Sequence, residues 1–453
     1  MDIPAVQSPS RFPRREAVDP FFHHSLIARR NSTMPAEKYE VNKYRWVIVG
    51  VYTLASATMA LTCFSVAPLV SSLSRDWGVS FSQANLVLIV LFGLFSGLVS
   101  LPGGIATDKF GWRLVFCFAQ TLLAVSALLR ASTRIWPLFA LFNVTGSIGL
   151  GLATSVIGAM VLKWFPRREV GVANAIANVG LAAGIAAGNA IIFPLLNALG
   201  WSGMFLTLGL IASAGAALSW IFLREQPPYP PEPLPPMVKV GLWESVKQVM
   251  NLDNIILLPF SLALVGYLGI VPAIFPVQFA SYGVALTTVG LLLSVMSLVG
   301  IPASLIIPAW AFRMGRPKLI MSLGAVVLVL AFLSVFFLPL GPQNIWLAFL
   351  IIIIMGCAMN SLMPIRMGLA QLQPGVRPWN AGVLMGIVMT ANGLGYFILP
   401  SISGMLVERS GPTSSALMLA GVTLATLLLV ILFVKEPKVE APAVPAAEPE
   451  PAS

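Results

Sequence analysis

Apolar residues gather along this chain in long, nearly uninterrupted runs, without the 3.6-residue stripes of an amphipathic helix or the alternation of an exposed strand. Each run is about as long as the roughly 20 residues that a helix needs to cross a bilayer core about 30 Å thick. The pattern predicts twelve membrane spans, at residues 46–70, 82–103, 114–131, 136–162, 171–197, 204–223, 254–280, 287–310, 319–339, 345–365, 380–406 and 413–434.

Helix is the structure expected for every span, because in hydrocarbon each backbone N–H and C=O must be satisfied within its own segment. A membrane barrel would need shorter segments that alternate apolar and polar residues, and these runs do not alternate. Internal prolines such as Pro68, Pro272 and Pro302 are therefore predicted to kink helices. The expected fold class is an all-α membrane protein.

Composition supports an integral membrane protein. Of the 453 residues, 57% are hydrophobic and 10% are charged, against about 25% charged in an ordinary soluble protein. Soluble enzymes, disordered proteins and disulfide scaffolds are excluded, and the three cysteines lie inside apolar runs. Because no nucleophile–base pair, metal cluster or phosphate loop is recognisable, neither an enzyme activity nor a cofactor nor a metal is predicted.

The basic residues predict the orientation of the chain in the membrane. The net charge is +10, and 23 of the 27 Lys and Arg residues fall on one side of the predicted spans. The positive-inside rule assigns that side, with both termini, to the cytoplasm. The charge then marks membrane topology in a plasma (inner) membrane and does not indicate a nucleic-acid partner; the expected partners are the lipid bilayer and a small-molecule substrate.

A proline-rich stretch divides the spans six and six. The expected organisation is a cytoplasmic tail at 1–45, a six-helix half at 46–223, a cytoplasmic linker at 224–253, a second six-helix half at 254–434 and a disordered tail at 435–453. Residues Leu242–Met250 are expected to form a short surface helix with Trp243 at the headgroups. Either Met1 or Met34 is the true start.

The two halves share a loop pattern. The second-to-third loop, from Gly104 to Arg113, resembles the eighth-to-ninth loop, from Trp310 to Lys318. Two six-helix halves in parallel repeat, with a substrate held between them near mid-membrane, form a known transporter architecture. The sequence therefore predicts two pseudo-symmetric halves.

The first of these loops also resembles the signature cytoplasmic loop of the major facilitator superfamily, G-x-(L/A)-(A/S/T)-D-(R/K)-x-G-x-(R/K). The matching residues are Gly104, Asp108, Lys109, Gly111 and Arg113. With twelve spans divided six and six, the resemblance covers nearly the whole chain. It implies the fold of that family and transport by alternating access, but no substrate.

Asp108 is the candidate gating residue in this loop. A carboxylate there can accept hydrogen bonds from Lys109, Arg113 or Arg168, or cap the N-terminus of the eleventh span. Such contacts would hold the halves together and break when the cytoplasmic side opens. The alternative is a tight turn with solvated charges. The second loop has Phe312 in place of the acid, so gating is expected to rest on the first.

The resemblance places the substrate cavity mainly between the first, fourth, seventh and tenth spans, with help from the second, fifth, eighth and eleventh. Polar residues at helical spacing in these spans are the cavity candidates: Thr58, Thr62, Asn143, Ser147, Tyr267, Asn360, Asn392 and Tyr396, with Arg366 as the nearest cation. The alternatives are hydroxyls bonded to their own helix, amides that bridge helices, and an Arg366 that extends to the membrane surface.

Acids and histidines are missing from the middle of the predicted spans, and the fourth span lacks the Arg that many proton-coupled members carry. The prediction is a monomeric facilitator or exchanger, or a weakly proton-coupled transporter, for an organic anion or a small amphipathic molecule. The alternative is a non-transporting assembly factor or sensor of the same fold. Glycines spaced by four, such as Gly180, Gly184 and Gly188, are expected to pack helices closely.

Overall fold

The computed structural model describes residues 42–166, 169–227, 242–376 and 380–435, which form helices and no strand within these ranges. The N-terminal half contains α2 (Arg45–Phe64), η2 (Ala67–Leu69), α3 (Val70–Trp77), α4 (Phe81–Asn85), the π-helix η3 (Leu86–Leu91), α5 (Phe92–Phe110), α6 (Trp112–Ala131), α7 (Trp136–Thr154), α8 (Ile157–Trp164) and α9 (Val170–Phe222). The C-terminal half contains α10 (Leu242–Val249), α11 (Leu252–Ser281), α12 (Leu286–Arg313), α13 (Pro317–Phe337), η5 (Pro342–Asn344), α14 (Ile345–Gln371), α15 (Ala381–Ser410) and α16 (Pro412–Phe433).

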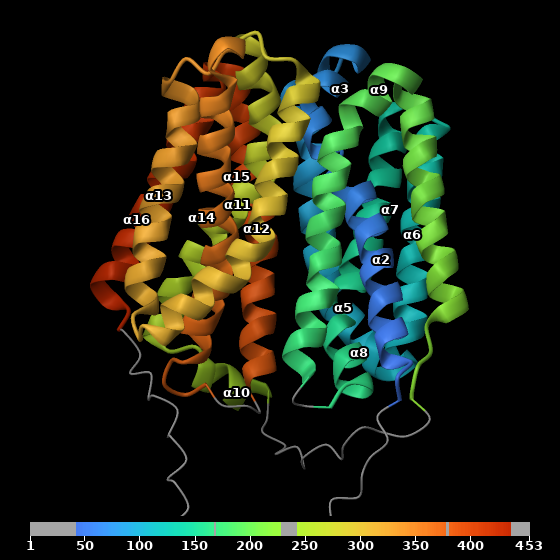
Figure 1. The fold of residues 1–453 in the computed structure, drawn as a ribbon, viewed down its shortest axis with the longest axis vertical. Helices are drawn as coiled ribbons and strands as arrows, with labels where there is room; N and C mark the ends of the chain where they lie inside the picture. The colour runs from blue at the N-terminus through green and yellow to red at the C-terminus, as the bar shows by residue number, and fades with distance from the viewer. Residues whose placement is uncertain (1–41, 167–168, 228–241, 377–379, 436–453) are drawn as a thin grey trace, which may run out of the picture. The chain divides into compact units, whose positions relative to one another are not determined.

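Eleven helical segments in the described ranges are long and apolar enough to cross a membrane. One of them, within α9, holds both the fifth and the sixth predicted span. The backbone of Gly200 leaves the helical region inside α9, with φ 65° and ψ −175°, and the helix reverses its direction there (Figure 1). The structure is therefore consistent with twelve spans, and the predicted all-α membrane fold is confirmed.

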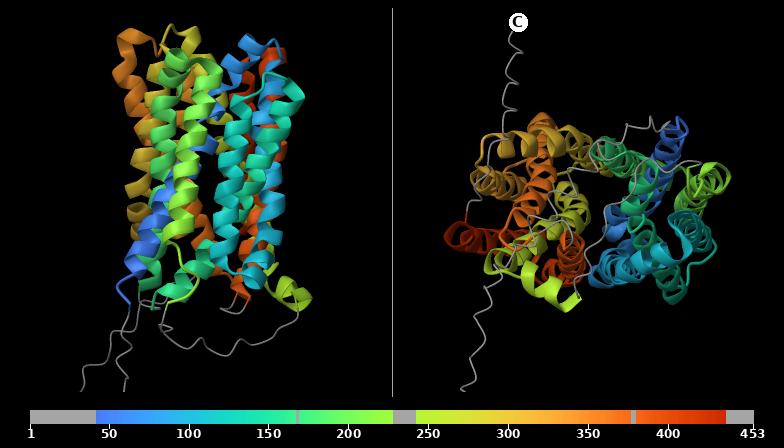
Figure 2. Two further views of the ribbon diagram at one scale, coloured as in Figure 1. Left: turned by 90° about the vertical axis from the view of Figure 1, so that its right-hand side faces the viewer. Right: turned by 90° about the horizontal axis from the view of Figure 1, so that it is seen from below.

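Successive spans run in opposite directions, so the bundle has two ends. We call the end where α2 begins and α16 ends the tail end, and the opposite end, where α9 turns at Gly200, the far end (Figures 1 and 2). The predicted surface helix is observed as α10, with Trp243 exposed. The predicted tails at 1–41 and 436–453 and most of the proline-rich stretch, 228–241, lie outside the described residues.

Glycines allow the closest helix contacts, as their spacing predicts. In the N-terminal half α2 packs along α9, where a Cβ atom on Gly184 would overlap the backbone of Ala57, and one on Gly188 would lie 2.8 Å from the Cβ of Ser65. Between the halves, a Cβ atom on Gly97 would lie 3.1 Å from the Cα of Gly393. Without side chains at these positions the backbones approach directly, as small residues permit in membranes.

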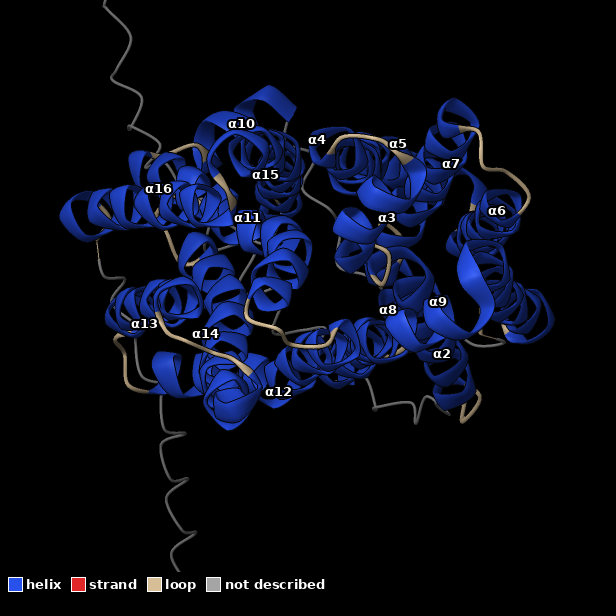
Figure 3. Cartoon of the chain, turned by 90° about the horizontal axis from the view of Figure 1, so that it is seen from above, coloured by secondary structure: helices blue, strands red, loops and turns tan. Residues whose placement is uncertain are grey.

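The two halves meet mainly toward the far end. In Figure 3 α12 lies beside α9, and these two helices contact each other; α15 contacts α4, η3 and α5, and α11 contacts η2 and α3. A single apolar cluster spans both halves in this region, containing for example Leu73, Phe193 and Phe275. The second cluster, around Trp112 and Trp164 near the tail end, contains residues of the N-terminal half only.

Two hydrogen bonds join the halves at the far end. Asn85 Nδ2 donates to the carbonyl of Pro400 at 2.6 Å, and the backbone N–H of Ser82 donates to Glu408 Oε1 at 2.7 Å. Together with the shared apolar cluster, these bonds form what we call the far-end seal. The described residues therefore hold the bundle closed at the far end.

Candidate functional site

A cavity of about 220 Å³ lies between the halves, on the tail-end side of the seal. Its walls come from α5 and α7 of one half and from α11, α14 and α15 of the other. The polar or sulfur-bearing residues that line it are Ser96, Ser100, Thr154, Met363, Met389, Asn392 and Tyr396. Two of the residues predicted to line a cavity, Asn392 and Tyr396, are among them.

Two residues of the cavity carry hydrogen-bond donors that no described residue uses. The carbonyl oxygen of Asn392 is occupied, since it accepts a 2.6 Å hydrogen bond from Ser261. Its amide nitrogen has only a 4.0 Å contact with the sulfur of Met389, and the hydroxyl of Tyr396 has no partner among the described residues. Ser96 and Ser100 donate to carbonyls of their own helix. The unused donors are thus an amide N–H and a phenol O–H, while the hydroxyl oxygens of the two serines can still accept a hydrogen bond.

Arg366 is not among the residues that line this cavity, but it lies close to one of them along α14. It follows Met363, a cavity residue, by three positions, which places both on one helix face about 4.5 Å apart along the axis. Side chains in a helix lean toward its N-terminus, here toward the level of Met363. Arg366 does not extend to the surface: its exposed fraction is 0%, and none of its three guanidinium nitrogens has a hydrogen-bond partner.

An unpaired guanidinium in a protein interior is energetically unfavourable by several kcal/mol. The described acids in ion pairs have other partners; Glu169 pairs with Arg45, Glu225 with Lys163 and Asp76 with Arg75. No carboxylate among the described side chains offsets the charge of Arg366. An anion close to the guanidinium would offset this charge.

The other predicted cavity residues lie in helix-packing contacts. Thr62 donates to the carbonyls of Thr58 and of Leu208 in α9, and Thr58 donates to Ala55 and lies against Gly215 of α9. Ser147 donates to Val144 of its own helix. These three hydroxyls thus follow the alternative that the sequence left open, in which they satisfy carbonyls of their own helix, and they lie inside the N-terminal half.

Asn143, Tyr267 and Asn360 are also inside the halves. Asn143 accepts from Arg130 and donates to the carbonyl of Val87, so it bridges α6, α7 and η3. Tyr267 is fully buried between α11, α13 and α16, with its hydroxyl 3.3 Å from that of Thr423. Asn360 donates to Gly356 and faces Gly300 of α12. None of the three lines the cavity described above. Spacing within one helix cannot show which face meets a neighbour and which meets a gap.

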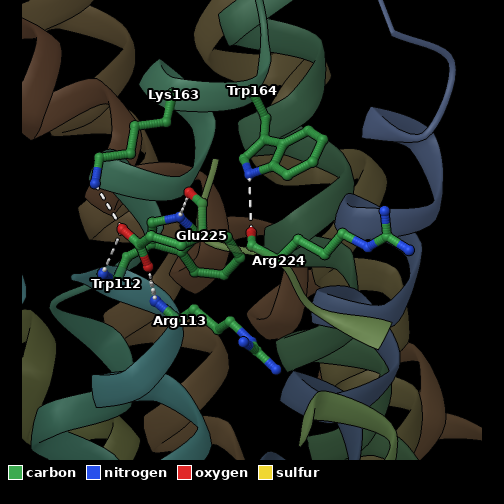
Figure 4. Close-up of polar contacts among 6 residues, drawn as sticks. All are labelled: Trp112, Arg113, Lys163, Trp164, Arg224 and Glu225. Carbon is green, nitrogen blue, oxygen red and sulfur yellow. Dashed lines mark hydrogen bonds and ion pairs between the residues drawn. The ribbon is translucent and has the colours of Figure 1, made fainter. Parts of the chain in front are cut away.

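The signature loop contains a contact that the sequence reading missed. Gly111 separates α5 from α6, and the carboxylate of Glu225, just after α9, caps the N-terminus of α6 (Figure 4). Glu225 accepts from the backbone N–H groups of Trp112 at 3.3 Å and Arg113 at 2.9 Å, and pairs with Lys163 of α8 at 2.6 Å. We call this arrangement the Glu225 clamp.

Glycine is required at the centre of the clamp. Gly111 has φ +89°, which residues with a Cβ rarely adopt, and a Cβ atom there would lie 2.7 Å from the carboxyl carbon of Glu225. The indoles of Trp112 and Trp164 donate to the carbonyls of Glu225 and Arg224. A carboxylate at a helix N-terminus is favourable for both the free N–H groups and the helix dipole.

The structure describes the contacts of some, but not all, of the residues in the predicted gate. Arg113 donates from Nη2 to the carbonyl of Trp220, and Lys109 lies over the ring of Phe110. A Cβ atom on Gly104 would meet no atom of another helix within 4 Å. The side chain of Asp108 and residue Arg168 lie outside the described part of the structure. The gate therefore stays a prediction.

The second loop uses the opposite charge. Lys318, at the start of α13, donates to the carbonyls of Ile431 at 2.8 Å and Val434 at 2.6 Å, at the end of α16. In the N-terminal half Glu225, an acid that follows the last span, caps the start of the third span. In the C-terminal half Lys318, a base at the start of the third span, caps the end of the last span. Both arrangements join corresponding helices at the tail end.

Comparison with known proteins identifies the family. The model of the Major Facilitator Superfamily matches residues 52–378, and the chain belongs to that family. It is 25% identical to the cyanate transport protein CynX of Escherichia coli, over 80% of this chain and 90% of that protein. It is 27% identical to the probable galactarate/D-glucarate transporter GarP of Escherichia coli, over 40% of each.

Solved structures show the same fold. The crystal structure of a point mutant of the nucleoside transporter NupG aligns with a TM-score of 0.70 and 16% identity, over 86% of this chain and 100% of that one. The helices, the family model and these relatives define the chain as a multi-span membrane protein of a transporter family.

Proposed function

We propose that this protein is a secondary transporter that carries a small, singly charged anion through the cavity between its halves by alternating access. The observation that carries the proposal is Arg366, a fully buried guanidinium with no partner, one helical turn from a residue that lines the cavity. An anion that reaches it offsets a buried charge that the described side chains leave unpaired.

The groups in the cavity support the same class of solute. The free amide N–H of Asn392 and the hydroxyl of Tyr396 are donors, and donors to an anion form charge-assisted hydrogen bonds. A single guanidinium offsets one negative charge. A dianion would carry a second charge out of water without a counter-charge, and that is unfavourable. Of the relatives named above, the cyanate transport protein is named for a singly charged anion and supports this class. The other is named as a probable transporter of galactarate and D-glucarate, which are dianions, and does not support it.

Alternating access requires the far-end seal to break and the tail end to close. We assign the tail end to the cytoplasm on the charge distribution, with domain boundaries at 1–45, 46–223, 224–253, 254–434 and 435–453, and we expect the protein to act as a monomer in a plasma (inner) membrane. Asp108 is the proposed cytoplasmic gate. Because the sequence has no acid or histidine in the middle of the predicted spans, we assign a facilitator or exchanger mechanism.

The test is uptake by proteoliposomes that contain the full-length protein. We expect uptake of cyanate or formate that saturates, and none of the neutral analogue formamide. Asn392→Ala and Tyr396→Phe should each weaken binding by about 1–3 kcal/mol, as expected for a lost hydrogen bond to a charged group. Asn360→Ala, in a packing contact, is the matched control and should leave affinity unchanged.

Two results would overturn the proposal. Equal affinity in Asn392→Ala, Tyr396→Phe and wild type would place the solute outside this cavity. Tight binding without uptake of any anion would favour the non-transporting alternative, a sensor or assembly factor of the same fold.

A further inference from the structure

A second cavity, of about 230 Å³, lies at the far end and belongs to the N-terminal half alone. Its lining residues are Trp77, Arg130, Ala131, Ser132, Thr133, Arg134, Trp201, Ser202 and Phe205. It shares no residue with the cavity between the halves. Its volume equals that of about eight water molecules at ~30 Å³ each, enough for a small organic molecule.

The cavity contains a buried cation that the proposed transport path does not use. Arg130 is 3% exposed; its Nη1 donates to the neutral oxygen of Asn143 at 3.1 Å, and its Nε is buried without a partner. The guanidinium lies 5.2 Å from the ring centre of Phe205. Among the described side chains no carboxylate forms an ion pair with Arg130.

A second cation lines the same cavity. Arg134 is exposed, and no ion pair joins it to a described acid. Asp76 contacts Trp201 of the cavity wall, and its carboxylate accepts hydrogen bonds from Arg75 at 3.4 Å and from the indole N–H of Trp201 at 3.1 Å. The cavity thus has two positive charges and no acid among its lining residues.

Aromatic rings form the apolar wall. Trp77 and Trp201 meet edge to face with centroids 6.1 Å apart, and Trp201 stacks on Phe205, also at 6.1 Å. The rings hold one another in place, so the wall is ordered before anything binds. Flat apolar groups pack favourably against such rings.

We propose that this far-end cavity is a binding site for a water-soluble organic monoanion, with its carboxylate at Arg130 and Arg134 and a flat apolar part against Trp77, Trp201 and Phe205. The site is separate from the transport path and does not rest on the proposed function. It lies at the far end of the bundle. A solute at the far end can therefore reach it while the far-end seal closes the cavity between the halves to that end.

The test measures binding of benzoate to purified full-length protein by isothermal titration, with benzamide as its neutral counterpart of nearly equal shape. We expect benzoate to bind and benzamide to bind at least about tenfold more weakly, because a charge-assisted hydrogen bond is worth more than about 1.4 kcal/mol. Equal binding of the two would overturn the site.

Variants locate the binding. Arg134→Gln changes an exposed side chain, should fold normally, and should weaken benzoate binding severalfold, whereas Arg409→Gln, at the same end but outside the cavity, is the matched control. Arg130→Gln should abolish binding, and its folding is checked by thermal unfolding. Unchanged benzoate affinity in Arg134→Gln and in a folded Arg130→Gln would refute the assignment.

Two further arms separate sources and sites. The headgroup of an anionic lipid is also an organic anion and could occupy the same site. Benzoate binding is therefore compared in phosphatidylcholine nanodiscs with and without phosphatidylglycerol. Equal affinity supports a soluble ligand, and a loss of affinity with phosphatidylglycerol would overturn the proposal in favour of a lipid. Asn392→Ala, which tests the transport cavity, should leave benzoate binding to the far-end site intact, so that the two proposals fail separately.

Discussion

Glu408, near the end of α15, accepts a 2.7 Å hydrogen bond from the backbone N–H of Ser82, at the first turn of α4 and 326 residues earlier in the chain. The carboxylate lies at a short helix whose first N–H groups lack partners within the helix. Beside it Asn85 binds the carbonyl of Pro400. These contacts hold the far end closed, and each is a point at which the seal can be tested.

Replacing Glu408 with Ala should loosen the seal. The bond is exposed, so its loss is expected to shift the balance between closed and open far ends by about 1 kcal/mol, or roughly fivefold. Spin labels at Asn197 and Gln343, both exposed at the far end in different halves, should report a larger population of long distances. Arg409→Ala, the adjacent control, should not change the distribution, and an unchanged distribution in Glu408→Ala would show that the apolar cluster alone closes the far end.

Gly184 tests the close approach of α2 and α9. A Cβ atom there would overlap the backbone of Ala57, so Gly184→Ala must push two helices apart, at a cost of about 1–3 kcal/mol. Gly50→Ala is the control, because nothing lies within 4 Å of the position where its Cβ would stand, and alanine favours a helix over glycine. Thermal unfolding in detergent should give a lower midpoint for the first variant and an equal or higher one for the second. Equal unfolding midpoints would mean that α2 and α9 can move apart without a loss of stability.

The spans, the glycine contacts and the surface helix α10 could be predicted from the sequence, because length, hydropathy and four-residue spacing are local properties of the chain. The fifth and sixth spans were predicted as separate, at 171–197 and 204–223, and the chain reverses between them at Gly200, inside α9. Hydropathy predicts this break, but the positive φ of Gly200 that makes the reversal leaves no mark in a hydropathy pattern.

The candidate site was only partly predictable. Asn392 and Asn360 have the same chemistry and a similar place in their helices, yet one lines the cavity and the other packs against Gly300. Which face meets a gap depends on how the helices pack, and spacing within one helix does not contain that information. Glu225 was missed for a related reason: at the end of a span it reads as one surface charge among several, and only the fold brings it to the start of α6.

Glu225→Ala should therefore destabilise the N-terminal half. It removes two hydrogen bonds to backbone N–H groups of α6 and the partner of Lys163, and the expected loss of unfolding free energy is about 1–3 kcal/mol. Glu244→Ala, on the exposed face of α10, is the control and should change the unfolding midpoint little. If the two variants unfold at the same temperature, the clamp contributes nothing to stability.

Arg366→Met should raise stability and abolish anion uptake. An apolar side chain of similar length removes an unpaired buried charge. Replacing even a buried ion pair by apolar residues is often neutral or stabilising by about 1–4 kcal/mol, and an unpaired charge lacks the attraction that such a pair has. Arg313→Met, at an exposed position near the same end, is the control for general effects of lost charge. A variant that is more stable and inactive would identify Arg366 as a residue kept for function. Wild-type uptake by Arg366→Met would contradict its role in binding the anion.

In the facilitator mechanism, the driving force for uptake is expected to be the membrane potential rather than a proton gradient. Described acids that form polar contacts, such as Asp76, Glu225 and Glu408, lie at helix ends, and the histidines of the chain, His23 and His24, precede the first span. A single anion that crosses alone carries one charge, which is worth about 2.3 kcal/mol per 100 mV.

Proteoliposomes with a potassium gradient and valinomycin set the potential, and a buffered pH step sets the proton gradient independently. An inside-positive potential should raise anion accumulation by up to about 50-fold per 100 mV at equilibrium, since about 1.4 kcal/mol is a factor of ten. A pH step of about one unit at zero potential should have little effect, because the assigned mechanism moves no proton with the anion. Liposomes without protein control for leakage of the anion and its protonated form. Accumulation that follows the pH step and ignores the potential would mean that a proton crosses with each anion, and the facilitator mechanism would then be abandoned.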